Sequence, residues 1–116
     1  MARETNPNFM DGVPELMILR LLQDRDMYGY ELVQAIRAET GDVVSLGEGV
    51  VYTVLHALER DGALKSRRKT VEGRSRIYYA VTAPGLRRYS DLATNWTALA
   101  GAIQTVMKGS RHHAAI

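Results

Sequence analysis

Apolar residues recur with the period of a helix in the middle of the chain, across residues 45–61. The positions that share one helix face, at the i, i+3, i+4 and i+7 spacing, are Val51, Val54, Leu55 and Leu58. Ser45 followed by Glu48 is a capping-box pattern that starts a helix, and Gly62 is suited to end one in the left-handed conformation. The strand-preferring run at 50–54 points to a strand instead, but the cap and the period together favour the helix.

The opposite side of this predicted helix carries small and hydrogen-bonding side chains rather than the Glu/Lys mixture of an ordinary solvated face. These side chains are Gly49, Tyr52, Thr53, His56 and Arg60. A helix with an apolar inner stripe and a small, polar outer face suits insertion into a DNA major groove. The pattern therefore predicts a recognition helix.

An apolar segment at 9–22 predicts an earlier helix, with Asp11 as its N-cap and Pro14 in its first turn, where a missing N–H costs nothing. This helix is apolar on more than one face, which indicates burial on two sides. Two interpretations stay open: a central core helix, or a helix with one face on its own domain and Leu16 on a partner subunit.

A second helix is predicted from an N-cap at Asp26 to about Thr40. Its core stripe consists of Leu32, Val33 and Ile36. Tyr28 and Tyr30 lie at its N-terminus, where free N–H groups and the helix dipole favour an anion such as a DNA phosphate. Alternatively, either tyrosine packs on the core and only points its hydroxyl outward.

Residues 63–70 and 75–82 predict the two strands of a hairpin. In the second strand Ile77, Tyr79 and Val81 alternate with polar or small residues, as expected for a strand with one buried face. The connection at 71–74 contains the glycine that a short hairpin turn needs.

Positive charge is concentrated on this hairpin. The chain has 15 Lys and Arg against 13 Asp and Glu, and six of the basic residues lie in twelve positions with one acidic residue, Glu72. The six are Lys65, Arg67, Arg68, Lys69, Arg74 and Arg76. Charges that only protect a sheet edge from aggregation have no need of a uniform sign, so the pattern favours a wing that contacts DNA phosphates.

The last predicted helix is capped by Thr82, has Pro84 in its first turn, and carries a heptad-like apolar seam. The seam consists of Tyr89, Leu92, Trp96, Leu99, Ile103 and Val106. Three short helices and a hairpin cannot easily cover so long a rod, which favours a homodimer. The alternative is that the helix folds back on its own domain.

Length and composition fit one globular domain of 116 residues. The chain contains no cysteine, no apolar run long enough to cross a membrane and no signal peptide at its N-terminus, so we expect a cytoplasmic protein without disulfides. The three histidines, His56, His112 and His113, do not occur in a sequence pattern typical of a catalytic or metal site. We expect no enzyme, no metal and no cofactor.

Three predicted helices followed by a basic hairpin have the element order of a winged helix-turn-helix. The expected fold class is mainly α, or α+β, with a winged helix-turn-helix DNA-binding domain at 9–82 and a dimerisation helix at 83–108. Residues 1–8 and 109–116 are expected to be flexible tails. Two other functions stay open: a winged-helix module that binds protein rather than DNA, and a small-molecule buffer.

Several segments of the chain closely resemble the PadR family of bacterial transcription regulators. They are residues 16–22, the Tyr-Gly-Tyr-Glu-Leu element within 27–32, 49–59, 61–64, the Arg-rich lead into Tyr78 and Tyr79 at 73–79, and 82–85. The resemblance covers about residues 12–107, and the single last helix is similar to the family's short subgroup. Two departures, Val50 in place of a Thr or Ser and Thr53 in place of a Pro, prevent any transfer of base preference.

The resemblance implies a homodimeric repressor in which the last helix packs against the partner's first and last helices, the third helix enters the major groove, and the wing touches the backbone or minor groove. Two third helices about 34 Å apart would read a pseudo-palindromic operator. The resemblance implies DNA contacts from Tyr28, Ser45, Gly49, Tyr52, Thr53, His56, Arg74 and Arg76. Some short members also stack planar aromatic compounds on a tryptophan of the last helix, in a pore at the dimer interface. Trp96, the single tryptophan here, is then either a ligand contact or a buried interface anchor.

Overall fold

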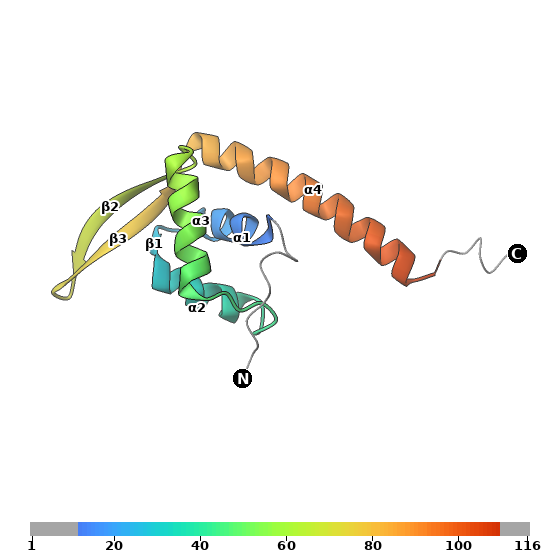
Figure 1. Ribbon diagram of the computed structural model, residues 1–116, viewed down its shortest axis with the longest axis horizontal. Helices are drawn as coiled ribbons and strands as arrows, with labels where there is room; N and C mark the ends of the chain where they lie inside the picture. The colour runs from blue at the N-terminus through green and yellow to red at the C-terminus, as the bar shows by residue number, and fades with distance from the viewer. Residues whose placement is uncertain (1–11, 110–116) are drawn as a thin grey trace, which may run out of the picture.

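The computed structural model describes residues 12–109, which form four helices and a three-stranded antiparallel sheet (Figure 1). In chain order the elements are α1 (Val13–Leu21), β1 (Met27–Tyr28), α2 (Gly29–Glu39), α3 (Glu48–Arg60), β2 (Leu64–Val71), β3 (Arg74–Val81) and α4 (Ala83–Met107). Figure 1 shows the hairpin of β2 and β3 extending from the body at one end of the molecule and α4 extending at the other.

The core lies where the first three helices meet the base of the sheet. Its largest fully buried side chains are Ile18, Leu19, Leu32, Ile36, Leu46, Val51, Leu55 and Leu58. The apolar stripes predicted for the second and third helices are thus confirmed, with Val54 partly buried at the edge of the core. Their burial orients the opposite side of α3 outward, because the two sides of a helix cannot both face the core.

The start of α3 differs from the prediction. Its N-cap is Gly47, in extended conformation and without a side-chain cap, so Ser45 lies two residues before the cap and the capping box is wrong. Leu46, which is 1% exposed, packs into the core next to this position; burial of Leu46 thus accompanies a later helix start. The end of α3 is as predicted, with Gly62 at φ +83°.

The start of α2 also differs. Residues 27 and 28 form a short strand that the sequence pattern did not predict, and Tyr28 rather than Asp26 is the N-cap of α2. The Tyr28 N–H donates to the Glu31 carboxylate at 3.2 Å, which is one half of a capping box. Asp26 is instead turned to Arg67 of β2, at 3.3 Å. For α1, the N-cap is Gly12; the predicted cap Asp11 is outside the described residues.

The sheet has the order β1-β3-β2, and β3 pairs with both neighbours in antiparallel register. The two predicted strands are confirmed with ends shifted by one residue. Glu72 and Gly73, which connect them, have φ of +52° and +78°, as the tight two-residue turn of a hairpin requires. This turn fixes the register and hence which side chains share a face.

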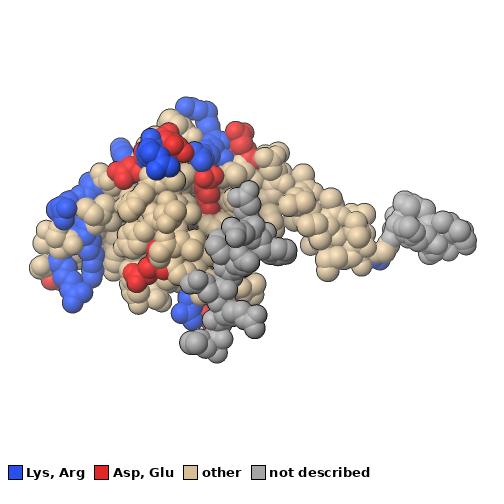
Figure 2. All heavy atoms as spheres, in the orientation of Figure 1, with Lys and Arg blue, Asp and Glu red and all other residues tan. Residues whose placement is uncertain are grey.

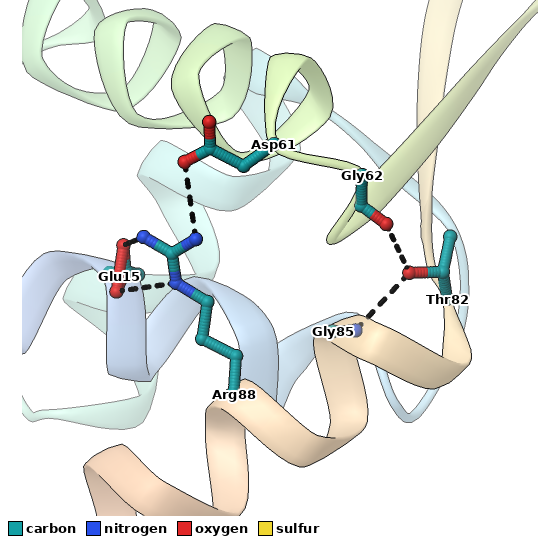
Figure 3. Close-up of polar contacts among 6 residues, drawn as sticks. All are labelled: Glu15, Asp61, Gly62, Thr82, Gly85 and Arg88. Carbon is teal, nitrogen blue, oxygen red and sulfur yellow. Dashed lines mark hydrogen bonds and ion pairs between the residues drawn. The ribbon is translucent and has the colours of Figure 1, made fainter.

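Thr82 caps α4, as predicted: its hydroxyl oxygen accepts from the Gly85 N–H at 3.2 Å and its hydroxyl group donates to the Gly62 carbonyl at 2.7 Å (Figure 3). The first turns of α4 therefore join the end of α3 directly. The C-terminal part of α4 projects from the body (Figure 1), and residues 92–107 contain no charged side chain. Within residues 12–109, no helix has both the length and the apolar character needed to span a membrane.

Candidate nucleic-acid interface

The outward side of α3 presents a stripe of small and polar side chains. Gly49, Thr53, His56 and Arg60 are all exposed and follow one another at helical spacing. The Thr53 hydroxyl donates its hydrogen to the Gly49 carbonyl at 2.8 Å, so its oxygen can only accept a further hydrogen bond. Thr53, which stands where many family members carry a proline, therefore adds a hydrogen-bond acceptor to this face in this conformation.

Tyr52 lies at the edge of this stripe and is half-buried. Its ring covers Gly29 at the start of α2 so closely that a Cβ on Gly29 would be 2.3 Å from the Tyr52 Cζ atom. A side chain at position 29 would force the Tyr52 ring to move, so the glycine of the Tyr-Gly-Tyr element allows this close approach. The centroids of the Tyr52 and His56 rings lie 6.0 Å apart, so this tyrosine joins α2 to the exposed face of α3.

The strand register sorts the wing cations onto one face. Antiparallel partners project to the same side of a sheet, and the pairs Lys65–Ala80, Arg67–Tyr78, Lys69–Arg76 and Val71–Arg74 share a side. Five of the six basic residues of the hairpin therefore lie on this side, which we call the basic wing face: Lys65, Arg67, Lys69, Arg74 and Arg76. Arg68 lies on the other side, where it donates to Ser75 at 3.0 Å.

Two tyrosines hold part of the basic wing face in place. Tyr28 and Tyr78, partners in the register of β1 and β3, meet edge to face with centroids 5.4 Å apart. The Arg76 guanidinium lies 4.4 Å from the Tyr28 ring centroid, and the Lys69 ammonium lies 5.0 Å from that of Tyr78. Cation–π attraction at these distances restrains long side chains, so the two cations are partly ordered before any anion arrives.

Figure 2 shows Lys and Arg gathered over the hairpin and over the region where α3 meets α4. On the hairpin, the one ion pair between the basic wing face and a carboxylate of the described residues joins Arg67 to Asp26, with side chains 60% and 36% exposed. Such a pair is weak in water, and so it leaves most of the positive field of the wing uncompensated. A cationic surface beside a polar helix face is the arrangement that DNA binding requires.

The seam predicted on the last helix divides into two parts. Tyr89 and Leu92 are partly buried against the core of their own domain. The remaining four side chains stay exposed: Trp96 at 44%, Leu99 at 53%, Ile103 at 47% and Val106 at 79%. The seam thus begins as an intramolecular contact and continues as an uncovered apolar stripe.

An open groove of about 380 Å³ lies between α1, the end of α2 and α4. Its walls include Leu16, Met17, Tyr89 and Trp96, with Glu39 at its rim and Asp24 paired to Arg20 at 3.0 Å. The groove brings Leu16 and Trp96, both predicted interface residues, to the same place. No group of three or more His, Cys, Asp or Glu among the described residues could hold a metal ion.

Residues 18–91 match the transcriptional regulator PadR-like family. The chain belongs to this family. Transcriptional regulator Rv3488 of Mycobacterium tuberculosis is 33% identical over 106 residues, which are 91% of this chain and 94% of that protein. As members of the PadR-like family and its relatives are transcriptional regulators, the protein is a transcriptional regulator and not an enzyme.

Solved structures agree with this membership. A transcriptional regulator from Clostridium thermocellum has a TM-score of 0.78 at 28% identity, over 87% of this chain and 96% of that one. A PadR family transcriptional regulator from Eggerthella lenta shares the fold, with a TM-score of 0.73 at 24% identity over 89% of this chain and 88% of that one. The predicted α+β winged-helix fold class is confirmed.

Proposed function

We propose that this PadR-like regulator is a homodimeric repressor that binds a pseudo-palindromic DNA operator in sequence-specific fashion. The observation that carries the proposal is the segregation of five cations onto one face of the hairpin, beside a recognition helix with an exposed stripe of small and polar side chains. Phosphate contacts supply affinity and register, and side chains in the groove supply discrimination.

In this proposal α3 enters the major groove. Thr53 and His56 reach base edges, Gly49 allows close approach, and Ser45 and Tyr52 border the entry. The wing cations Lys65, Arg67, Lys69, Arg74 and Arg76 contact phosphates from the basic wing face, and Arg68 contributes from the opposite face of the hairpin. Tyr28 acts mainly through Arg76, which is stacked on its ring.

In the proposed dimer the helices at 83–108 associate and bring together two copies of the DNA-binding domain, residues 9–82. The stripe of Trp96, Leu99, Ile103 and Val106 packs against its counterpart, because an exposed apolar seam on a helical stretch without charges needs a partner in water. The two α3 helices then lie about 34 Å apart and meet successive major grooves on one side of the duplex.

Replacement of Arg74 and Arg76 by alanine is expected to weaken binding to all DNA sequences by a similar factor. Each lost phosphate contact lowers the slope of log K against log salt by roughly one unit, because fewer counterions are released on binding. Fluorescence anisotropy of a labelled duplex, titrated at several salt concentrations, measures this slope.

The matched control is Arg20→Ala with Arg37→Ala, which removes the same charge from α1 and α2, where both arginines pair with carboxylates. The control should keep the slope of the unaltered protein. An unchanged slope in the wing variant would contradict the assignment of the wing to phosphate contact.

We further propose that the groove at Trp96 takes a planar, cationic aromatic ligand that favours one arrangement of the dimer and so releases DNA. Trp96 offers a partly exposed ring for stacking, and Glu39 at the rim offers a carboxylate. A ligand shifts the equilibrium only if it binds one arrangement better than the other.

Titration with planar cationic dyes should quench tryptophan fluorescence. The signal comes from Trp96 alone, because the chain has a single tryptophan. Anionic dyes of the same shape should quench less, because the rim carboxylate repels them. Absence of quenching by every dye of a broad panel would count against the ligand site while leaving the DNA proposal intact.

A further inference from the structure

Arg88, in the second turn of α4, joins three helices through one side chain (Figure 3). Its Nε and Nη2 atoms donate to the two carboxylate oxygens of Glu15 on α1, at 3.2 and 2.7 Å. Its Nη1 atom donates to Asp61, the C-cap residue of α3, at 3.2 Å. The side chain of Glu15 is 21% exposed, that of Arg88 37% and that of Asp61 45%, so the cluster is partly sheltered.

This geometry restricts direction as well as distance. A two-pronged guanidinium–carboxylate contact is planar and holds both groups in one orientation. The hydrogen bond to Glu15 and, to a lesser degree, that to Asp61 raise the pKa of Arg88, while partial burial lowers it. The positively charged form that these contacts require is therefore maintained.

The cluster lies next to the junction at which α3 is followed by the hairpin and α4. There Thr82 bridges the Gly62 carbonyl and the Gly85 N–H, and Gly85 approaches the backbone of Ala63. The junction fixes where α4 starts, and apolar side chains of the following turns pack on the core without a fixed direction. Arg88, one turn past the junction, adds the directional polar contact that sets the angle between α4 and the end of α3.

A small change of this angle has a large effect at the recognition helix. From Asp61, which Arg88 contacts, back to Gly49 near its start, α3 is about 18 Å long. If α4 is held in a dimer, a pivot of about 10° at Arg88 moves the start of α3 by roughly 3 Å, which is close to the rise of one base pair.

We infer that Arg88 is a positioning residue that fixes the distance between the two recognition helices, and thereby the half-site spacing that the dimer accepts. The inference rests on the proposed DNA-binding dimer and assigns the spacing to one side chain that touches no DNA. Arg87, its exposed neighbour, makes no ion pair with any residue from 12 to 109 and serves as the matched control.

The distance between the recognition helices can be measured without DNA. Because the chain has no cysteine, His56→Cys gives one spin label on each α3, and Thr94→Cys gives one on each α4, on the side away from the seam. Pulsed electron paramagnetic resonance then gives the distribution of distances between subunits. With Arg88→Ala, the distribution at position 56 should broaden roughly twofold or more, as expected for a pivot at the base of α4.

The distribution at position 94 should stay unchanged with Arg88→Ala, and both distributions should stay unchanged with Arg87→Ala. Arg88→Lys keeps the charge but cannot make the two-pronged contact, so the width of the distance distribution at position 56 should be intermediate. If Arg88→Ala does not fold, Arg88→Lys takes its place in the test. An unchanged width at position 56 would overturn the inference, as would equal broadening at 56 and 94, which would indicate a loosened dimer.

A second readout uses DNA. One base pair inserted between the half-sites should cost the parent protein affinity, and Arg88→Ala should reduce the ratio of the two Kd values by roughly threefold or more. A merely structural role would weaken binding to both duplexes equally and leave this ratio unchanged, which would contradict the inference. If the labelled parent protein gave no measurable label-to-label distance, both the dimer and the inference would be overturned. If the parent protein dimerised but bound no DNA, the repressor proposal and the assignment of half-site spacing would be overturned.

Discussion

Replacement of Leu99 and Ile103 by aspartate is expected to convert the protein into a monomer and to lower its affinity for a two-half-site duplex by about 100-fold or more. The two side chains lie one turn apart on the exposed seam of α4 and are 53% and 47% exposed in the single chain. In the proposed dimer they are buried, where an unpaired carboxylate is strongly disfavoured. Light scattering gives the oligomeric state, and anisotropy gives the affinity.

Thr94→Asp with Ala98→Asp is the control, since it adds the same charges at the same spacing on the opposite side of α4, where both residues are exposed. This control should remain a dimer and retain its affinity for DNA. If the Leu99 and Ile103 variant also remained a dimer, the assignment of the exposed seam to the subunit interface would be wrong.

Gly85→Ala is expected to destabilise the fold by at least about 2 kcal/mol, as overpacking against rigid groups does. A Cβ at position 85 would be 2.1 Å from the Ala63 carbonyl oxygen and 2.8 Å from Val81 Cγ2. The Ala63 oxygen cannot simply withdraw, because it accepts the Thr82 N–H at 3.1 Å. Urea unfolding measures the loss of stability, and a displaced α4 should also impair DNA binding.

Gly101→Ala in the same helix is the matched control, because a Cβ there has nothing within 4 Å. Alanine is favoured over glycine in a helix interior by roughly 0.5–1 kcal/mol, so this variant should be slightly more stable than the parent protein. Equal effects of the two substitutions would contradict the steric role assigned to Gly85.

The sequence pattern identified those elements whose signals are local and repeated. The 3.6-residue period of Val51, Leu55 and Leu58 outweighed the strand preference of the residues around them, and α3 is a helix. The alternation that ends in Tyr79 and Val81, with a glycine in the turn, was sufficient to locate the hairpin. The uniform sign of its charges is also local, and the pairing then showed that most of them share one face.

Features that depend on contacts between distant segments were not predictable in this way. The short strand β1 exists because Met27 and Tyr28 pair with Tyr79 and Tyr78, some fifty residues later. Arg88 lies 73 residues from Glu15, and no spacing rule links the two. At Ser45 a local pattern was overridden, since the helix starts at Gly47 beside the buried Leu46.

The most direct test of sequence-specific DNA binding is fluorescence anisotropy of the purified protein on the DNA upstream of its own gene, with scrambled competitor, at several salt concentrations. The proposal predicts tight binding that resists the competitor and weakens steeply as salt rises, because phosphate contacts release counterions. Failure to bind any duplex at low salt would contradict it, and would instead indicate a winged-helix module that binds another protein.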